Sequence, residues 1–127
     1  MTLLLDTTVL IDVLRNKRNR RALLAQLVEQ GHILATSALN IGEIYAGMRP
    51  EETIQTEAFL ESLECFPITA KIARHAGSLK QSREQKGRTL TLADMIVAAT
   101  ALENGIPLMT DNRKDFPLPE LTLHPLS

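Results

Sequence analysis

Five side chains stand at positions where a metal-dependent reaction could use them. They are Asp6, Glu43, Asp94, Asp111 and Asn112. Each offers oxygen atoms, which are the ligands that Mg²⁺ and Mn²⁺ prefer in proteins. Carboxylates that gather without lysine or arginine repel one another, and a divalent cation would remove this repulsion. If the fold brings them together, these residues predict a Mg²⁺ (or Mn²⁺) site that accepts phosphate groups of a substrate.

Asp94 lies in the segment TLADMIVAAT (91–100), which is otherwise almost entirely apolar. The segment predicts a helix buried in the core, and a buried carboxylate is costly unless it is paired, hydrogen-bonded or bound to a metal. Thr91 and Asp94 also match a capping box. Both roles are compatible, because a cap would fix the carboxylate while a cation binds its outer oxygen.

Two of the other acids have a structural interpretation as well. Asn40 and Glu43 match a capping box, and Asp6 could cap a helix that begins at Thr7. Capping alone does not require these acids to converge on one place. Whether the strands bring these acids together therefore decides between capping alone and a shared metal site.

Short apolar segments alternate with helical patterns along the chain. Strands are expected at 2–6, 32–36, 65–68, 106–110 and 120–126. Helices are expected at 7–15, 18–30, 37–48, 51–64, 70–86 and 91–104. Most strands are too far apart for hairpins, so crossover helices should join parallel strands. We predict an α/β fold, a three-layer α/β/α sandwich with a mainly parallel, twisted sheet of about five strands.

The candidate residues follow the carboxyl ends of these strands. Asp6 ends the first strand, Glu43 lies on the helix after the second, and Asp111 and Asn112 follow the strand 106–110. In open α/β sheets the carboxyl ends of the strands form one edge, and ligands bind there. Asp94, at the start of its helix, can reach the same edge. We therefore expect these side chains to meet.

The amino-acid composition limits the classes of protein to which this chain can belong. The chain has 127 residues, 44% of them hydrophobic and 23% charged, which fits one soluble domain. It lacks a membrane-length apolar run and a signal peptide, and its single cysteine excludes an internal disulfide, so a cytoplasmic location without membrane contact is expected. The net charge of −1 excludes a globally basic nucleic-acid binder. Local basic stretches nevertheless occur at 15–21 and 71–88.

Three segments in this order resemble a known family. They are LLLDTTVLID near the start, SALNIGEIYAGM in the middle and TLADMIVAATALENGIPLMTDNRKDF near the end. Together they resemble a PIN-domain ribonuclease and, within that group, the VapC toxins of type II toxin–antitoxin pairs. The resemblance covers essentially the whole chain, as a single domain of residues 1–127.

The resemblance implies metal-dependent endonucleolytic cleavage of RNA with Mg²⁺ or Mn²⁺. The first three acids of the family match Asp6, Glu43 and Asp94, each a catalytic residue and metal ligand. The fourth position falls in TDNRKDF, on Asn112. Asp111 and Asp115 flank it, and which of the three completes the site stays open.

The implied mechanism is an in-line displacement assisted by two divalent ions about 3.5–4 Å apart. Glu43 could orient or deprotonate the water, and the hydroxyls of Thr7 and Thr110 could add contacts. No histidine base is required, and the three histidines stand in unrelated contexts. The products would carry a 5′-phosphate and a 3′-hydroxyl.

The resemblance also implies partners. They are an RNA substrate, a cognate antitoxin protein and a second copy of the chain in a homodimer. The two basic stretches would then contact RNA phosphates.

Two alternatives to a nuclease toxin remain. One is a PIN-like interaction module that has lost catalysis. The other is a receiver-like phosphoacceptor domain, which would need a lysine at the end of a late strand, where this sequence has none.

Overall fold

The computed structural model describes residues 1–84, 87 and 89–126. Within them, four strands form one sheet, in the order β3-β2-β1-β4. The strands are β1 (Thr2–Leu5), β2 (Ile33–Ser37), β3 (Glu64–Phe66) and β4 (Leu108–Met109). Every pairing between them is parallel. The prediction of an α/β fold with a parallel sheet is confirmed.

Six helices surround this sheet in the described part of the chain. They are α1 (Thr7–Leu14), α2 (Arg20–Glu29), α3 (Ala38–Gly47), α4 (Thr53–Glu61), α5 (Ala70–Arg83) and α6 (Leu92–Glu103). Short 3₁₀ turns, η1 (Pro50–Glu52) and η2 (Arg113–Asp115), precede α4 and follow β4. All six predicted helices are present, although several are shorter than expected. The predicted helix 70–86 ends at Arg83, and residues 85 and 86 lie outside the described part.

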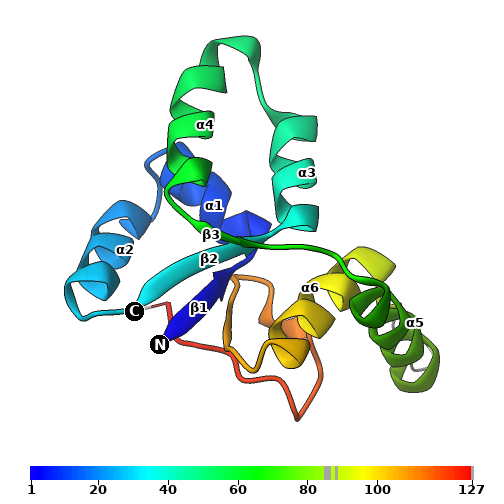
Figure 1. Ribbon diagram of the computed structural model, residues 1–127. Helices are drawn as coiled ribbons and strands as arrows, with labels where there is room; N and C mark the ends of the chain where they lie inside the picture. Colours follow the sequence, from blue (N-terminus) through cyan, green and yellow to red (C-terminus); the bar gives the residue numbers. More distant parts are fainter. Residues whose placement is uncertain (85–86, 88, 127) are drawn as a thin grey trace.

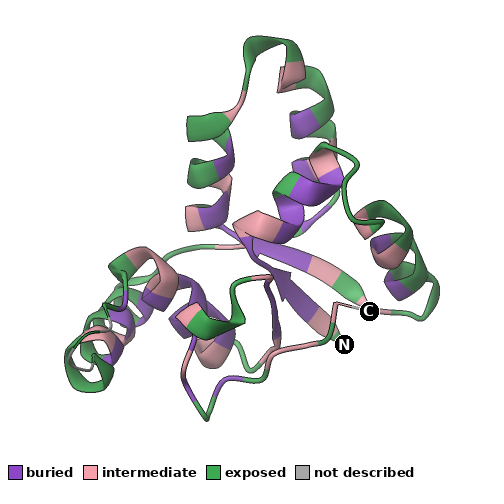
Figure 2. Ribbon diagram, turned by 180° about the vertical axis from the view of Figure 1, so that it is seen from behind, coloured by how far each residue is buried: buried purple, intermediate pink, exposed green. Residues whose placement is uncertain are grey.

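The alternation of side chains along the strands builds two hydrophobic cores. Leu3 and Leu5 pack with apolar residues of α1–α4, whereas Leu4 packs with those of α5 and α6. Figure 1 shows α5 and α6 on one side of the sheet and the other four helices on the opposite side. All three leucines are fully buried, and each contributes about 1.5–3 kcal/mol of hydrophobic stabilisation. Figure 2 shows buried strands beneath helices whose outer faces are exposed.

The fifth predicted strand, 120–126, is reduced to a single parallel bridge between Leu108 and Leu123. The sheet therefore has four strands, one fewer than expected. Two causes are local. The neighbouring strand β4 has only two residues, and Pro125 lacks the backbone N–H that would continue a ladder beyond the bridge.

Helix starts at the carboxyl edge of the sheet set the direction of the polar side chains. The hydroxyl of Thr91 accepts a hydrogen bond from the Asp94 amide at 3.0 Å, so Thr91 caps α6 as predicted, but the reciprocal bond of a capping box is not among the described hydrogen bonds. The cap of α3 differs from the prediction. Ser37 occupies the N-cap position and accepts a hydrogen bond from the Asn40 amide at 3.2 Å, so the predicted capping box of Asn40 and Glu43 is wrong.

Among the described residues, no helix has the length and apolar character needed to cross a membrane.

Candidate active site

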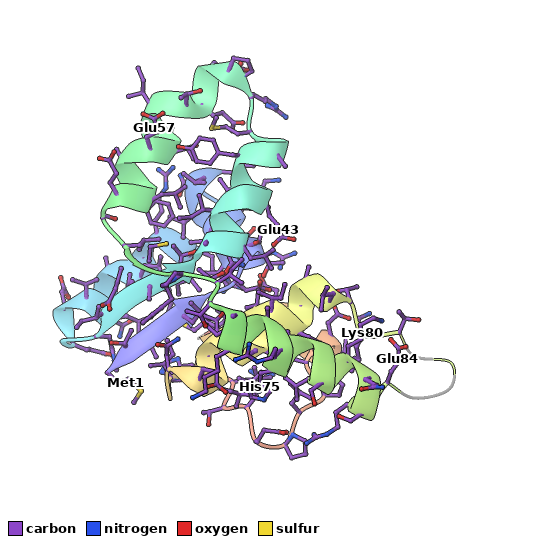
Figure 3. All side chains as sticks on the ribbon, turned by 45° about the vertical axis from the view of Figure 1, so that its right-hand side comes forward. Met1, Glu43, Glu57, His75, Lys80 and Glu84 are labelled. Carbon is purple, nitrogen blue, oxygen red and sulfur yellow. The ribbon has the colours of Figure 1, made fainter. Side chains whose placement is uncertain are left out.

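Three carboxylates reach the carboxyl edge of the sheet from three different elements. Asp6 follows β1 directly, Glu43 lies on α3, and Asp94 belongs to the first turn of α6. Figure 3 shows Glu43 on the side of α3 that faces the region where α6 begins. Both Asp94 and Glu43 lie close enough to Asp6 that their negative charges raise its pKa. The fold thus brings together three residues that are far apart in the sequence.

Asp6 is the most buried member of this group, with 5% of its surface exposed. Its Oδ2 atom accepts a hydrogen bond from Thr110 Oγ1 at 2.7 Å, and its Oδ1 atom accepts one from Asn40 Nδ2 at 3.3 Å. It stands at the N-cap position of α1, but its side chain makes no capping hydrogen bond. A purely capping role therefore does not account for Asp6.

Burial is the main cause that raises the pKa of Asp6 above 3.8, and the hydrogen bond from Thr110 partly offsets it. The pKa of Asp94 is raised as well, first by burial and then by the charges of Asp115 and Glu43, while a hydrogen bond with Thr91 lowers it. Two carboxyl groups with raised pKa values thus lie beside further acids. The ionised form of these groups is unfavourable in this site, a feature that is common in active sites.

Glu43 is exposed, but its carboxylate is held in place. Its Oε1 atom accepts a hydrogen bond from Thr7 Oγ1 at 2.6 Å. The Thr7 hydroxyl oxygen in turn accepts one from Asn40 Nδ2 at 3.0 Å. Asn40 is fully buried and links the Asp6 and Glu43 carboxylates, a role that the sequence did not predict. The only signal for it was an amide in an apolar segment, one turn before Glu43 on the same helix.

The three candidates for the fourth position behave differently. The Asp111 carboxylate is bound by Arg20 at 2.7 Å and by Arg18 at 3.5 Å. Asn112 is exposed, and its backbone N–H donates to Thr110 Oγ1 at 3.0 Å. Asp115 lies near enough to Asp94 to raise its pKa. Of these three residues, Asp115 is the one whose negative charge acts on Asp94.

The donor set fits a hard divalent cation. In the described part of the chain no ion pair involves Asp6, Glu43, Asp94 or Asp115. All four offer carboxylate oxygens, which suit Mg²⁺ and Mn²⁺. Among the same residues, no three His, Cys, Asp or Glu side chains are arranged as a complete metal-binding group. Mg²⁺ commonly takes only one or two protein carboxylates, with waters and substrate phosphates as its other ligands.

Most of the described basic residues in the two basic stretches already have partners. In the stretch 15–21, Arg15 pairs with Glu52, and Arg21 donates to the Val13 carbonyl at 2.7 Å. In the stretch 71–88, Lys71, Lys80 and Arg83 pair with Glu103, Glu84 and Glu120. Lys86 and Arg88 lie outside the described residues. His75 pairs with Glu103 at the C-terminal end of α6, the opposite end from Asp94, so it takes no part in the site.

Comparison with known proteins places this geometry among relatives. A family model described as "PIN domain" matches residues 3–118. Ribonuclease VapC19 from Mycobacterium tuberculosis is 35% identical over 91% of this chain and 92% of its own length. Ribonuclease VapC2 from Haemophilus influenzae is 28% identical over 89% of this chain and 88% of its own.

Solved structures show the same fold. VapBC2 from Rickettsia felis, bound to a DNA fragment from its promoter, superposes with a TM-score of 0.85 at 24% identity, over 98% of both chains. A toxin–antitoxin complex from Klebsiella pneumoniae superposes with a TM-score of 0.76 at 28% identity, over 94% of this chain and 95% of the other.

Proposed function

The chain belongs to the PIN-domain family and, within it, to the VapC ribonucleases, and from this premise we propose that it is a divalent-metal-dependent endoribonuclease. It would act as the toxin of a toxin–antitoxin pair. The observation that carries the proposal is the group formed by Asp6, Glu43, Asp94 and Asp115, which lies at the carboxyl edge of the sheet and has no cationic partner among the described residues. An active role explains why these charges are held together uncompensated.

Asp6 and Asp94 would hold the Mg²⁺ or Mn²⁺ ion, with Glu43 and Asp115 beside them. When bound, such an ion activates water and stabilises charge during in-line displacement at phosphorus. Asp6 is prevented from turning away by hydrogen bonds from Thr110 and Asn40. Glu43 is exposed and held by Thr7, so it can orient a water molecule that approaches the phosphate. The products would carry a 5′-phosphate and a 3′-hydroxyl.

RNA would be held mainly through its phosphates. Aromatic residues make up only 3% of the chain, so base stacking contributes little. In the stretch 15–21, the side chains of Arg15, Lys17 and Arg18 are exposed and make no hydrogen bond in the described structure, although Arg15 lies 3.8 Å from Glu52. Arg18 lines a shallow pocket together with Asn112. A phosphate group beside the carboxylates could contact this pocket.

A cognate antitoxin is the expected protein partner, because the related solved structures include toxin–antitoxin complexes. An apolar groove between α2 and α4 offers a surface for it, with Leu24, Val28, Phe59 and Leu63 among its lining residues. Val28 is 56% exposed in the chain alone, which is unusual for a large apolar side chain at a groove. A homodimer is expected as well, and sedimentation of the purified chain would test it.

Membership of the PIN-domain family removes the receiver-like alternative, but a module that binds partners without catalysis remains to be tested. The experiment uses the purified chain without antitoxin, total RNA, and Mg²⁺ or Mn²⁺ with EDTA as the metal-free control. We expect cleavage by the wild type and by Glu57→Gln, an exposed acid of α4, but not by Asp94→Asn. Equal behaviour of the wild type and folded Asp94→Asn would support the non-catalytic module instead.

A further inference from the structure

A second charged cluster lies next to the acids of the candidate site. It consists of Asp12, Arg18, Arg20 and Asp111, which we call the ion cluster. Arg20 lies 2.7 Å from an Asp111 oxygen and 3.7 Å from Asp12, and Arg18 lies 3.5 Å and 3.9 Å from the same two carboxylates. The cluster joins α1, the start of α2 and the turn that follows β4.

Arg20 is the central member of the ion cluster. Its side chain is only 12% exposed, and its Nη1 atom also donates a hydrogen bond to the Leu126 carbonyl at 3.2 Å. One planar guanidinium thus connects the turn after β4 with the last described residues of the chain. Arg20 Nε and Asp12 Oδ2 are both buried and lack a hydrogen-bond partner among the described residues. Buried charges of this kind contribute little net stability because desolvation opposes their attraction, so another role must explain the cluster.

The loop before α2 adopts an unfavourable backbone to form the ion cluster. Asn16, Arg18 and Asn19 have φ angles of 52°, 57° and 57°, in the left-handed region, which asparagine adopts readily but arginine avoids. Such conformations persist where the surrounding contacts require them, often beside functional sites. Here they deliver Arg18 and Arg20 to Asp111.

From Asp111, the contacts lead directly to the catalytic acids. Thr110, the preceding residue, donates to Asp6 Oδ2 at 2.7 Å. Asn112, the following residue, donates its backbone N–H to the same threonine hydroxyl at 3.0 Å. Asp115, on the same turn, contributes to the raised pKa of Asp94. A shift of Asp111 would therefore move Thr110, which donates to Asp6, and Asp115, whose charge acts on Asp94.

We propose that Arg20 is a positioning residue for the active site and that Asp111 serves as its anchor, not as a metal ligand. Arg20 holds the turn of residues 110–115 through Asp111. The position of this turn then orients Thr110 towards Asp6 and Asp115 towards Asp94. This inference rests on the proposed nuclease function for its kinetic consequence. Its structural part, the restraint of the turn, is independent of any metal or RNA.

Hydrogen–deuterium exchange in the metal-free, RNA-free chain tests the structural part. Amides of residues 110–116 should exchange about 10-fold faster or more in Arg20→Gln, and less so in Arg20→Lys, which keeps the charge but lacks the planar guanidinium that reaches Asp111 and Leu126 together. Arg21→Gln is the matched control, because the neighbouring Arg21 donates to carbonyls of α1 instead. Unchanged exchange of the turn in folded Arg20→Gln would overturn the proposal.

Cleavage rates in a double-mutant cycle test the kinetic part. Arg20→Gln should lower kcat/KM about 10- to 100-fold and raise the Mg²⁺ concentration for half-maximal rate, because displaced supporting groups weaken both. Asp111→Asn should have a smaller effect, and the double variant should be no worse than Arg20→Gln alone. If Asp111→Asn abolishes cleavage while exchange of the turn is unchanged, Asp111 is a metal ligand and the proposal fails. If neither the wild type nor any variant cleaves RNA, the proposed nuclease function is wrong. The hydrogen–deuterium exchange result then still shows whether Arg20 restrains the turn.

Discussion

Two groups of acids lie side by side at the carboxyl edge of the sheet and differ in how their charge is balanced. Asp12 and Asp111 are paired with Arg18 and Arg20. Asp6, Glu43, Asp94 and Asp115 have no such partner in the described residues, and the pKa values of Asp6 and Asp94 are raised by burial and by neighbouring acids. Asp111 and Asp115 belong to opposite groups, although they stand four residues apart on one turn.

On the proposed function, the contrast separates residues that hold the structure from residues that would bind the metal ion. An acid with its own arginine is neutralised inside the fold and gains nothing from a cation. An acid held among other acids is stabilised only when a cation arrives. Substitution in the unpaired group should therefore mainly affect catalysis, whereas substitution in the ion cluster should lower stability and affect catalysis only through the position of the 110–115 turn.

The largest effect is expected for the two acids of the unpaired group whose pKa values are raised. Asp94→Asn and Asp6→Asn should each lower RNA cleavage by about 10³-fold or more, since loss of a metal ligand removes several kcal/mol of transition-state stabilisation. Circular dichroism and thermal unfolding should show an intact fold, because the amide has nearly the shape of the carboxylate. Unfolding of Asp94→Asn under conditions where the wild type is folded would return Asp94 to a purely capping role.

A smaller effect divides the two acids of one turn. Asp115→Asn should lower cleavage about 10- to 100-fold and leave the free energy of unfolding unchanged or slightly higher, because it removes repulsion from Asp94. Asp111→Asn should lower the free energy of unfolding by about 1–3 kcal/mol, since it leaves Arg20 with less compensation. Denaturant titration measures both values. Equal loss of stability in the two variants would remove the distinction between the groups.

Next in size is the loss of a hydrogen bond to the unpaired group. Thr110→Val keeps the shape of the side chain but removes the donor that lowers the pKa of Asp6. Cleavage should fall about 10-fold, with the acidic limb of its pH profile moved to higher pH. Thr100→Val is the control, because Thr100 is equally buried but donates to the Ile96 carbonyl within α6. Similar losses in both variants would show a packing effect only.

The smallest effect is a pH dependence of stability. The pKa of Asp6 is raised in the folded chain, so the folded state binds its proton more tightly than the unfolded state. This contribution to the free energy of unfolding is fully present below pH 3.8 and is lost as pH rises through the raised pKa. Metal-free wild type and Asp111→Asn should show this loss in full, whereas Asp6→Asn should show a smaller loss, because the raised pKa of Asp94 contributes in the same direction. Thermal unfolding across this pH range measures the difference between variants.

Much of this arrangement was predictable from the sequence. Strand-end acids and the α/β pattern predicted that Asp6, Glu43 and Asp94 would meet at one edge, because parallel strands impose it. The contribution of Asn40 was not predictable, since Ser37 and not Asn40 caps α3. The role of Arg20 was hidden for a different reason. Its partner Asp111 lies 91 positions away in the sequence, and only the folded turn brings them together.

The choice among Asp111, Asn112 and Asp115 shows the same limit. The spacing in TDNRKDF pointed to Asn112, but spacing carries no information on which neighbour an arginine neutralises. That depends on the loop at residues 16–19, where Asn16 and Asn19 favour left-handed backbone but do not indicate which acid the following arginines reach.

Binding of Mn²⁺ to the purified, antitoxin-free chain, followed by electron paramagnetic resonance, tests the central distinction most directly. The wild type and Asp111→Asn should both bind the ion, whereas Asp94→Asn should bind it at least about 10-fold more weakly, because only the unpaired group lacks its own cation. Loss of Mn²⁺ binding in Asp111→Asn together with full binding in Asp94→Asn would contradict the division of the acids into a structural and a catalytic group.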